Sequence, residues 1–336
     1  MHRVVSLLSV QIDIERMKNN SALSETVNSW IDSYNFPAEP ANLYEPIRYT
    51  LEAGGKRLRP TLLLAAAKAF GAADEDVKNQ CIGIEMFHNF TLLHDDLMDN
   101  SELRRGRPTV HRRWDANTAI LSGDTMLTLA TELIAKCAPR FIEPVLSLFN
   151  RTAIQVYEGQ QYDMDFENRN DVTVPEYMEM IRLKTSVLLA CALKMGALLG
   201  QASPSDAAAL YDFGIKLGLA FQLRDDYLDT FGDPLVFGKS IGGDIINDKK
   251  TWLMITARNE DTSGVMKKAI EGRYPHDEKI NAVTNVYRQL NLDNRITELI
   301  ARYGREAVDT ISPLKMDNEI RRYLISLAEN LSNRAN

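Results

Sequence analysis

The chain has 336 residues, of which 45% are hydrophobic and 25% are charged, an ordinary globular composition with enough chain to bury a large core. Its formal net charge of −7 gives no general attraction to nucleic acid or anionic lipid, so no nucleic-acid partner is expected and any basic function must be local. Cys81, Cys137 and Cys191 are far apart and in no metal-ligand spacing, which favours buried thiols in a reducing compartment, the cytoplasm.

Apolar residues recur at three- and four-residue intervals over long stretches, and strand signals are nearly absent, so an all-α fold is predicted. No Gly-, Ser- or Pro-rich linker divides the chain, which favours a single domain over residues 1–336. The most apolar helix, Thr185 to Gly200, is interrupted by Lys194 and is shorter than the roughly 20 apolar residues of a membrane span. No stable membrane insertion is therefore expected.

In chain order, the first predicted element is an amphipathic helix at Ser21–Tyr34, and residues 1–40 are expected to form a helical extension. Later helix starts are marked by Pro60, by the capping box Thr173–Glu176 and by Ser203 before a proline. Two long helices are expected, each followed by a loop. The helix at 76–99 precedes a loop at 100–108, and the helix at 204–231 precedes a loop at 232–248.

Two acidic runs share the spacing Asp-Asp-x-x-Asp, at Asp95–Asp99 and at Asp225–Asp229, and each ends a predicted apolar helix. The first and last aspartates of each run lie on one helix face, where like charges destabilise a helix by roughly 0.2–0.5 kcal/mol. Mg²⁺ prefers oxygen ligands and is usually held by one or two carboxylates together with substrate phosphates. The spacing therefore favours a magnesium-bound diphosphate over a solvated acidic face, the alternative for either run alone.

Basic residues are placed to bind that diphosphate. The stretch Gly54–Pro60 combines two glycines, a dense cationic patch and the start of a helix, which favours phosphate binding. Each arginine of Leu103–Pro108 can bind two phosphate oxygens at once through its guanidinium group. Further positive charges could come from Lys184, Lys239, Lys249 and Lys250. Each of these arginines and lysines could also be an ordinary surface cation, and this interpretation is favoured for Arg107 and Lys250.

His88 precedes Asp95 by two helical turns and lies on nearly the same face, although from spacing alone a core histidine is the simpler interpretation. Together with Glu85 it also forms the Glu-x-x-His of ferritin-like di-iron bundles, which makes a redox metalloprotein a rival hypothesis. Such a site needs the motif twice, and the sequence contains it once.

The chain resembles the trans-type isoprenyl diphosphate synthases, which include farnesyl, geranylgeranyl and longer polyprenyl diphosphate synthases. The first forty residues and the C-terminal third match weakly. The matching stretches occur in family order and are GGKRLRP at Gly54–Pro60, EMFHNFTLLHDDLMDNSELRRGRPTVH at Glu85–His111, GQQYDMD at Gly159–Asp165, the pair Lys184-Thr185, FQLRDDYLD at Phe221–Asp229, and FGKSIGGD with the later Lys249.

The resemblance implies an isoprenoid synthase bundle with a central cavity between helices, a homodimer, and three Mg²⁺ ions per active site. Both acidic runs would hold these ions on the diphosphate of an allylic substrate, through Asp95, Asp96, Asp99, Asp225, Asp226 and Asp229. The same diphosphate would be held by Arg104, Lys184 and Lys239, with Lys249 beside them. The pocket for isopentenyl diphosphate would be formed by Lys56, Arg57, His88 and Arg105. Thr185 and Gln222 would direct oxygens toward the developing carbocation.

Product length is expected to depend on the residues below the first acidic run. Thr91 lies one turn before Asp95, Phe90 flanks it, and Phe87 continues the stripe. An aromatic ring at Phe90 can form the floor of the cavity, although both phenylalanines could be ordinary core residues. In family terms this pattern resembles short-chain synthases, with a geranylgeranyl product favoured over a farnesyl one.

The sequence thus predicts an Mg²⁺-dependent prenyltransferase of isoprenoid biosynthesis that condenses isopentenyl diphosphate with an allylic diphosphate. A class I terpene cyclase is the nearest enzymatic alternative, although such enzymes normally carry an Asn/Asp–Ser/Thr–Glu motif in place of the second acidic run. A catalytically silent subunit of a heteromeric synthase is the non-enzymatic alternative, and it is disfavoured because both runs are intact.

Overall fold

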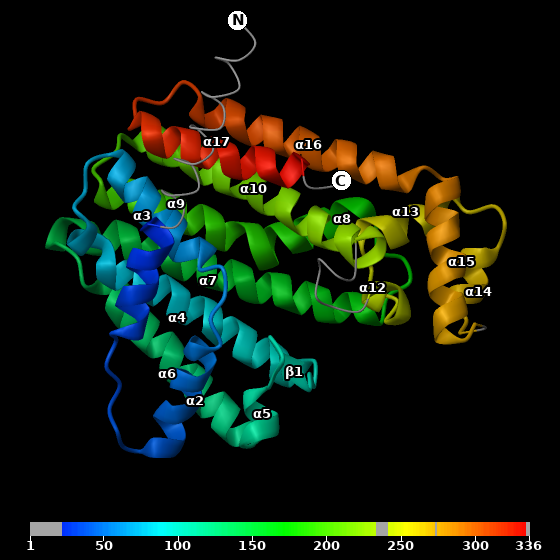
Figure 1. The fold of residues 1–336 in the computed structure, drawn as a ribbon, viewed down its shortest axis with the longest axis horizontal. Coiled ribbons are helices and arrows are strands. Elements are labelled where there is room, and N and C mark those ends of the chain that lie inside the picture. Colours follow the sequence, from blue (N-terminus) through cyan, green and yellow to red (C-terminus); the bar gives the residue numbers. More distant parts are fainter. Residues whose placement is uncertain (1–21, 233–240, 273, 334–336) are drawn as a thin grey trace, which may run out of the picture. The chain divides into compact units, whose positions relative to one another are not determined.

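The computed structural model describes residues 22–232, 241–272 and 274–333 (Figure 1). Helices dominate these residues, and their single sheet is a two-stranded hairpin. The all-α prediction is confirmed. No helix among the described residues has both the length and the apolar character needed to cross a membrane.

The described chain divides into two compact units. Unit 1 comprises the described residues of Met1–Phe149 with Ala192–Ala207 and Met316–Tyr323. Unit 2 comprises those of Asn150–Cys191, Ala208–Lys315 and Leu324–Asn336. The single-domain organisation and its central cavity stay predictions. The boundary falls within four helices, which are α7 (Pro139–Glu167), α9 (Val187–Leu199), α10 (Pro204–Phe231) and α17 (Asn318–Asn333).

Unit 1 is built around one long helix. Residues 22–32 are helical, within the helix predicted at Ser21–Tyr34, whereas residues 33–40 of the predicted helical extension are not helical and residues 1–21 lie outside the described residues. The elements that follow are α2 (Ala41–Glu52), α3 (Leu58–Ala69), α4 (Asp74–Met98), β1 (Leu103–Arg104), β2 (Arg107–Pro108), α5 (Val110–Arg113) and α6 (Ala116–Ala135). Helix α4 packs against α3 and α6, as the ribbon also shows (Figure 1). Its first turn carries the carboxylates of Asp74, Glu75 and Asp76, which interact favourably with the positive end of the helix dipole.

Fully buried side chains from these three helices form the core of unit 1. They include Leu62 and Leu63 of α3, Ile84 and Phe87 of α4, and Met126 of α6. Burying each such side chain stabilises the fold by about 1.5–3 kcal/mol. The packing fixes the body of α4, and hence the end that carries the first acidic run.

Unit 2 contains the elements α8 (Val174–Ile181), η1 (Arg182–Ser186), α12 (Gly243–Ile246), α13 (Trp252–Glu260), α14 (Val265–Ile270), α15 (His276–Gln289) and α16 (Leu292–Ile311). Two glycines allow close approach to the π-helix η1. A Cβ atom on Gly159 of α7 would lie 2.3 Å from the backbone nitrogen of Lys184, and one on Gly218 of α10 would lie 2.5 Å from Cα of Ser186. Both helices therefore contact the backbone of η1.

Most predicted helix boundaries agree with the structure. Helix α4 begins two residues before its predicted start, and α10 has the predicted bounds, with Ser203 Oγ accepting a hydrogen bond from the Asp206 N–H at 3.1 Å. The capping box of α8 is present, since Thr173 and Glu176 exchange hydrogen bonds. Both predicted loops are wrong in one respect, because the loop at 100–108 contains the β1–β2 hairpin and the loop at 232–248 contains the short helix α12. Strands of two residues are too short to produce an alternating pattern.

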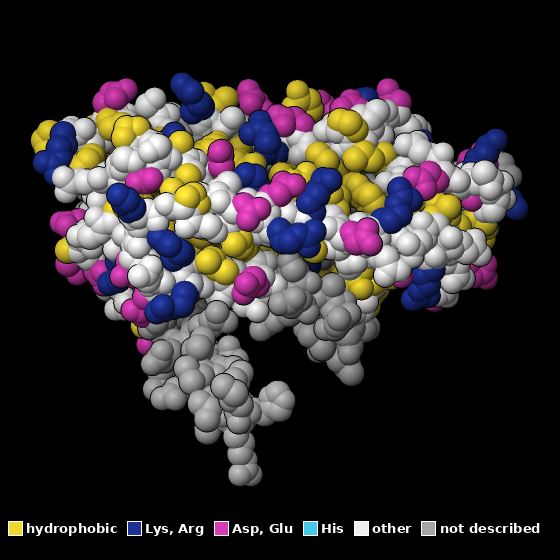
Figure 2. Space-filling model, turned by 90° about the horizontal axis from the view of Figure 1, so that it is seen from above, with side chains coloured by type: hydrophobic (Ala, Val, Ile, Leu, Met, Phe, Trp, Pro, Cys, Tyr) yellow, Lys and Arg dark blue, Asp and Glu magenta, His cyan; other side chains and the backbone are white. Residues whose placement is uncertain are grey.

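All three cysteines are among the described residues, and none of them forms a disulfide. Cys81 and Cys191 are buried, whereas Cys137 is half-buried in the connection between α6 and α7. Burial raises the pKa of the Cys81 and Cys137 thiols. On the face shown in Figure 2, Lys and Arg side chains are interspersed with Asp and Glu side chains.

Candidate active site

The first acidic run lies at the C-terminal end of α4. Asp95 is half-buried, Asp96 is 5% exposed, and Asp99 caps the helix. The N–H groups of Asn100 and Ser101 donate to the carbonyls of Leu97 and Asp96, at 3.2 and 2.9 Å, with Asn100 at a φ of 51°. This is a Schellman motif, which ends the helix and turns the chain back toward it.

The β1–β2 hairpin then returns an arginine to the acidic run. Arg105 and Gly106 form its two-residue loop with φ angles of 52° and 74°, which suit a type I′ turn. Arg104 Nε lies 2.8 and 2.7 Å from the two carboxylate oxygens of Asp96, and its Nη2 lies 3.8 Å from Asp95 Oδ2. The buried middle aspartate is thus held by the hairpin.

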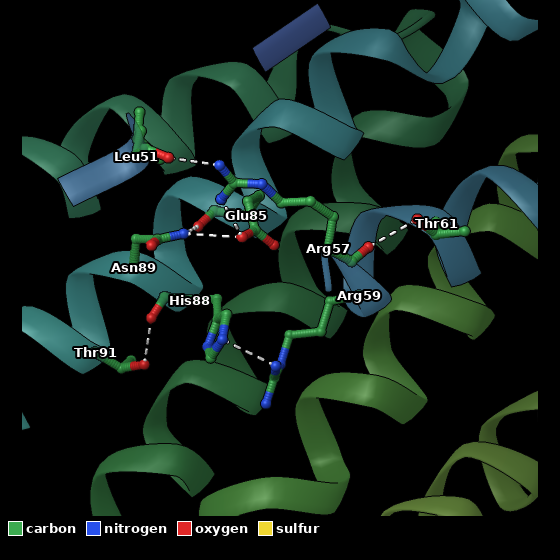
Figure 3. Close-up of polar contacts among 8 residues, drawn as sticks. All are labelled: Leu51, Arg57, Arg59, Thr61, Glu85, His88, Asn89 and Thr91. Carbon is green, nitrogen blue, oxygen red and sulfur yellow. Dashed lines mark hydrogen bonds and ion pairs between the residues drawn. The ribbon is translucent and has the colours of Figure 1, made fainter. Parts of the chain in front are cut away.

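The cationic stretch Gly54–Pro60, which leads into the first turn of α3, contacts α4 at two points (Figure 3). Arg57 is 4% exposed; its Nη1 lies 2.7 Å from Glu85 Oε1, and its Nη2 donates to the Leu51 carbonyl at 2.5 Å. Arg59 Nη1 lies 3.0 Å from His88 Nε2. Burial, reinforced by Arg59, lowers the pKa of His88 well below its usual range, and burial lowers the pKa of Arg59 to about 10. A neutral His88 can accept this hydrogen bond from Arg59.

Lys56 of the same stretch and Arg105 of the hairpin loop are exposed. The Arg105 guanidinium approaches Gly55 so closely that a Cβ atom there would lie 2.6 Å from Arg105 Nη2. We call the following residues of unit 1 the α4 cluster: Lys56, Arg57, Arg59, His88, Asp95, Asp96, Asp99, Arg104 and Arg105.

Arg59 was not among the predicted site residues. It stands two residues after Arg57 in the same basic stretch, and one-dimensional spacing does not tell which of the two is buried. The structure does, because Arg57 is paired with Glu85 whereas the half-buried Arg59 contacts His88. The predicted role of Arg57 in substrate binding stays untested, but its guanidinium is already occupied.

The second acidic run lies at the C-terminal end of α10 and has a similar burial pattern. Asp225 and Asp229 are half-buried, and Asp226 is 3% exposed. Asp226 accepts hydrogen bonds from the Tyr177 hydroxyl and, at 3.2 Å, from Gln222 Nε2. Burial, together with the nearby Asp244 carboxylate, raises the pKa of Asp226 to about 7. A divalent cation nearby would stabilise the ionised form of this buried carboxylate.

The π-helix η1 carries the predicted pair Lys184 and Thr185. Lys184 Nζ lies 2.6 Å from Asp163 Oδ2, and Thr185 Oγ1 donates to Gln222 Oε1 at 3.1 Å. Single-turn π-helices are frequent at functional sites. The π-helix η1 was not predicted from the sequence.

The connection after α10 contributes further charges. The Asp244 N–H donates to Asp229 Oδ2 at 2.9 Å, and Lys249 Nζ lies 3.8 Å from Asp244 Oδ1. Burial raises the pKa of Asp244 to about 6. The predicted residue Lys239 lies outside the described residues. We call the following residues of unit 2 the α10 cluster: Asp163, Tyr177, Lys184, Thr185, Gln222, Asp225, Asp226, Asp229, Asp244 and Lys249.

Three members of the α10 cluster were not predicted. Asp163 and Asp244 lie within GQQYDMD and FGKSIGGD, which were matched as stretches without a role for these carboxylates. Tyr177 lies on α8, outside every matched stretch, and only its contact with Asp226 reveals it.

The proposed chain-length residues lie on the body of α4. Phe87 is fully buried and Phe90 is 6% exposed, with their ring centroids 5.6 Å apart. Phe90 also contacts the His94 ring at 4.7 Å, and Thr91 Oγ1 donates to the His88 carbonyl at 2.8 Å. Their effect on product length stays a prediction.

A pocket of about 400 Å³, which includes space open to solvent, lies beneath the arginine hairpin in unit 1. It is lined by residues of α2, α4 and the hairpin, among them Tyr49, Asn89, Asp96, Arg104 and Arg105. The hairpin is anchored there, since the Tyr49 hydroxyl donates to the Pro108 carbonyl at 2.7 Å.

The di-iron hypothesis does not agree with this geometry. Both candidate ligands face an arginine, because Glu85 pairs with Arg57 and His88 accepts from Arg59. Two guanidinium groups beside a Glu-x-x-His pair disfavour a bound cation.

An all-α chain in which two helices end in paired carboxylates, each with basic side chains nearby, defines an enzyme of the isoprenoid synthase class. The profile of the family described as polyprenyl synthetase matches residues 40–290. A geranylgeranyl diphosphate synthase of Methanosarcina mazei is 42% identical over 246 residues, 73% of this chain and 75% of the relative. The chain belongs to the polyprenyl synthetase family and is a prenyltransferase.

Two further relatives cover nearly the whole chain. A geranylfarnesyl diphosphate synthase of Natronomonas pharaonis is 35% identical, covering 93% of this chain and 95% of its own. A crystal structure of a geranylgeranyl pyrophosphate synthase has a TM-score of 0.87 at 43% identity, covering 95% of this chain and 98% of that one. These relatives differ in the length of the product that their names give.

Proposed function

We propose that this protein condenses isopentenyl diphosphate with an allylic diphosphate in a head-to-tail reaction that forms a short-chain prenyl diphosphate. Geranylgeranyl diphosphate is favoured over farnesyl diphosphate as the product. One observation carries the proposal: in each acidic run the middle aspartate is buried and accepts hydrogen bonds from a neighbouring element, Asp96 from Arg104 and Asp226 from Tyr177. Each run is therefore held in a fixed orientation.

The donor set fits Mg²⁺. Both clusters offer carboxylate oxygens without thiolates, and Mg²⁺ is held by one or two carboxylates together with substrate phosphates. Among the described residues, no three Asp, Glu, His or Cys side chains form a complete metal cage. We assign three ions to the six aspartates, with Asp95, Asp99, Asp225 and Asp229 as the principal ligands. When bound, Mg²⁺ would neutralise charge on the departing diphosphate.

The reaction breaks the bond between C1 of the allylic substrate and its diphosphate oxygen, which leaves with the electron pair. Arg104, Lys184 and Lys249 would stabilise the charge that develops on those oxygens, and Lys239 would join them. The double bond of isopentenyl diphosphate then attacks C1, and a proton passes to the released diphosphate.

Side-chain oxygens would stabilise the carbocation without attacking it. The Gln222 carboxamide is held at both ends, because its oxygen accepts from Thr185 and its nitrogen donates to Asp226. Its orientation, and that of Thr185, is thereby fixed before the substrate binds. Such preorganised dipoles need no rearrangement during the reaction.

For the isopentenyl diphosphate pocket we propose Lys56, Arg59, His88 and Arg105. Arg59 replaces Arg57 among the direct phosphate ligands because Arg57 is buried against Glu85. An imidazole that accepts from Arg59 can direct that guanidinium and can donate its other N–H to a phosphate oxygen.

We further propose a homodimer in the cytoplasm. Exposed apolar side chains on α6, Ile120 at 43% and Leu121 at 59%, support a covered surface, and three cysteines outside any disulfide support a reducing compartment.

One assay tests the function. The purified protein receives labelled isopentenyl diphosphate and Mg²⁺ with dimethylallyl, geranyl or farnesyl diphosphate in turn, and the products are sized by chromatography. We expect elongation that stops at twenty carbons and disappears when Mg²⁺ is chelated. Cyclic hydrocarbons made from an allylic diphosphate alone would identify a terpene cyclase. Absence of any product would favour the non-catalytic subunit.

A further inference from the structure

Glu85 and His88 lie one turn apart on α4, and each faces an arginine of the stretch Gly54–Pro60, Arg57 just before α3 and Arg59 in its first turn (Figure 3). The two arginines are separated by a single residue, Leu58. The Glu-x-x-His pair of α4 therefore contacts the basic stretch at two points. His88 belongs to the proposed isopentenyl diphosphate pocket, whereas Glu85 has no role in the reaction described above.

A buried carboxylate next to a pocket for an anionic diphosphate would oppose binding unless its charge were balanced. Glu85 is 2% exposed, and Arg57 lies 2.7 Å from it, so the pair is neutral as a whole. Asn89, one turn further along α4, donates to the same Glu85 oxygen at 3.0 Å. The positive charge of Arg57 is thereby neutralised inside the protein and is not presented to substrate.

Arg57 joins three elements. Its side chain holds the carbonyl of Leu51 near the end of α2, its carbonyl accepts hydrogen bonds from Thr61 in the first turn of α3, and its guanidinium pairs with Glu85 on α4. Its φ of 44° is a conformation that non-glycine residues seldom adopt and that persists only where surrounding contacts enforce it. The buried ion pair holds the backbone in this conformation.

We propose that Glu85 is a positioning residue for isopentenyl diphosphate: through Arg57 it fixes the turn that presents Lys56 on one side and Arg59 on the other. This inference rests on the proposed function. Without the pair, the turn would relax and the two cations would lose their fixed separation. Recognition of the allylic diphosphate, which depends on other side chains, would be preserved.

The test is the variant Glu85→Gln, which keeps shape and removes the charge that holds Arg57. Calorimetry would measure the dissociation constant of isopentenyl diphosphate alone, and steady-state kinetics the KM of both substrates. We expect the dissociation constant and KM for isopentenyl diphosphate to rise at least tenfold, while KM for the allylic substrate changes less than twofold. Glu85→Asp, which keeps the charge on a shorter side chain, should raise the dissociation constant and KM for isopentenyl diphosphate less. It provides the test if Glu85→Gln does not fold.

The matched control is Asp74→Asn. Asp74 pairs with Lys68 at 2.6 Å and also joins α4 to α3, but at the opposite end of α3. It should leave both KM values within twofold of the unchanged protein. A double variant, Glu85→Gln with Arg57→Gln, should bind isopentenyl diphosphate no more weakly than Glu85→Gln alone, because one residue acts through the other.

Three results would overturn the inference: unchanged binding in a folded Glu85→Gln variant, an equal rise of both KM values, or additive losses in the double variant. Binding is measured without turnover, so the proposed function can fail separately. If the unchanged protein binds isopentenyl diphosphate but makes no product, the function fails and the positioning inference is still decided by the variants. If it binds none, both are wrong.

Discussion

Three residues other than glycine have positive φ angles within or beside the α4 cluster: Arg57 at 44°, Asn100 at 51° and Arg105 at 52°. Each marks a turn that redirects the chain, at the start of α3, at the end of α4 and at the hairpin loop. Side chains in this conformation are costly and persist only where surrounding contacts enforce them. Sequence patterns place glycine or asparagine in such turns, so the two arginine positions were not predictable.

Gly55 offers a test at this scale. In Gly55→Ala the new Cβ would lie 2.6 Å from Arg105 Nη2, so the flexible guanidinium must move. We expect KM for isopentenyl diphosphate to rise about tenfold while the melting temperature falls only slightly, measured by steady-state kinetics and calorimetry. Gly54→Ala is the control, because that site also has a positive φ but has no heavy atom within 4 Å of the new Cβ. Equal effects of both variants would assign the loss to backbone strain alone.

Phe90 tests the control of product length. Its ring contacts Phe87 and His94, so Phe90→Ala would open space at the body of α4. We expect products longer than twenty carbons by chromatography, with a loss of stability of about 3–5 kcal/mol. Phe149→Ala, which removes another ring against Phe87, should destabilise the protein without lengthening the product. An unchanged product length in a folded Phe90→Ala variant would reject this role.

At the scale of elements, periodicity identified the long helices well. The bounds of α10 and the capping box of α8 were predicted, because helix starts and apolar spacing are local signals. The π-helix η1 and the β1–β2 hairpin were not. Both depend on tertiary contacts, η1 on close packing of glycines against its backbone and the hairpin on the pairing of Arg104 with Asp96.

Gly159 tests the role of η1. In Gly159→Ala the added methyl group would lie 2.3 Å from the backbone nitrogen of Lys184, and a backbone cannot yield as a side-chain tip can. We expect a loss of about 1–3 kcal/mol in unfolding free energy and at least a tenfold fall in kcat, since Lys184 and Thr185 would shift. Denaturant unfolding and steady-state assays measure both. The exposed neighbouring variant Glu158→Ala should leave both unchanged, and a fully active Gly159→Ala variant would show that η1 tolerates displacement.

For the whole molecule, the fold class and most of the clustered residues could be predicted, because the acidic and basic stretches are local and the resemblance orders them. Arg59, Tyr177 and Asp163 could not be assigned, since each is revealed by a contact with a residue distant in the sequence. Burial likewise separates Asp96 and Asp226 from the aspartates on either side of them. Such differences arise from packing, which spacing alone does not encode.

The proposed homodimer is a property of the whole molecule. We expect Leu121→Lys to weaken association, because Leu121 is 59% exposed and a lysine buried in an interface would lose its hydration. Sedimentation equilibrium should give twice the mass of one chain for the unchanged protein and a concentration-dependent lower mass for the variant. The exposed α16 variant Arg302→Glu is the control. If both variants sediment like the unchanged protein, the interface lies elsewhere than this face of α6.

The unequal burial of the three thiols has a practical consequence. Cys81 and Cys191 are enclosed in the core, while the half-buried Cys137 lies between α6 and α7. A maleimide dye added to the native protein should therefore attach at that one position. Cys137 thus provides a natural attachment site for a fluorescent dye or spin label. No cysteine has to be introduced and no native cysteine has to be removed.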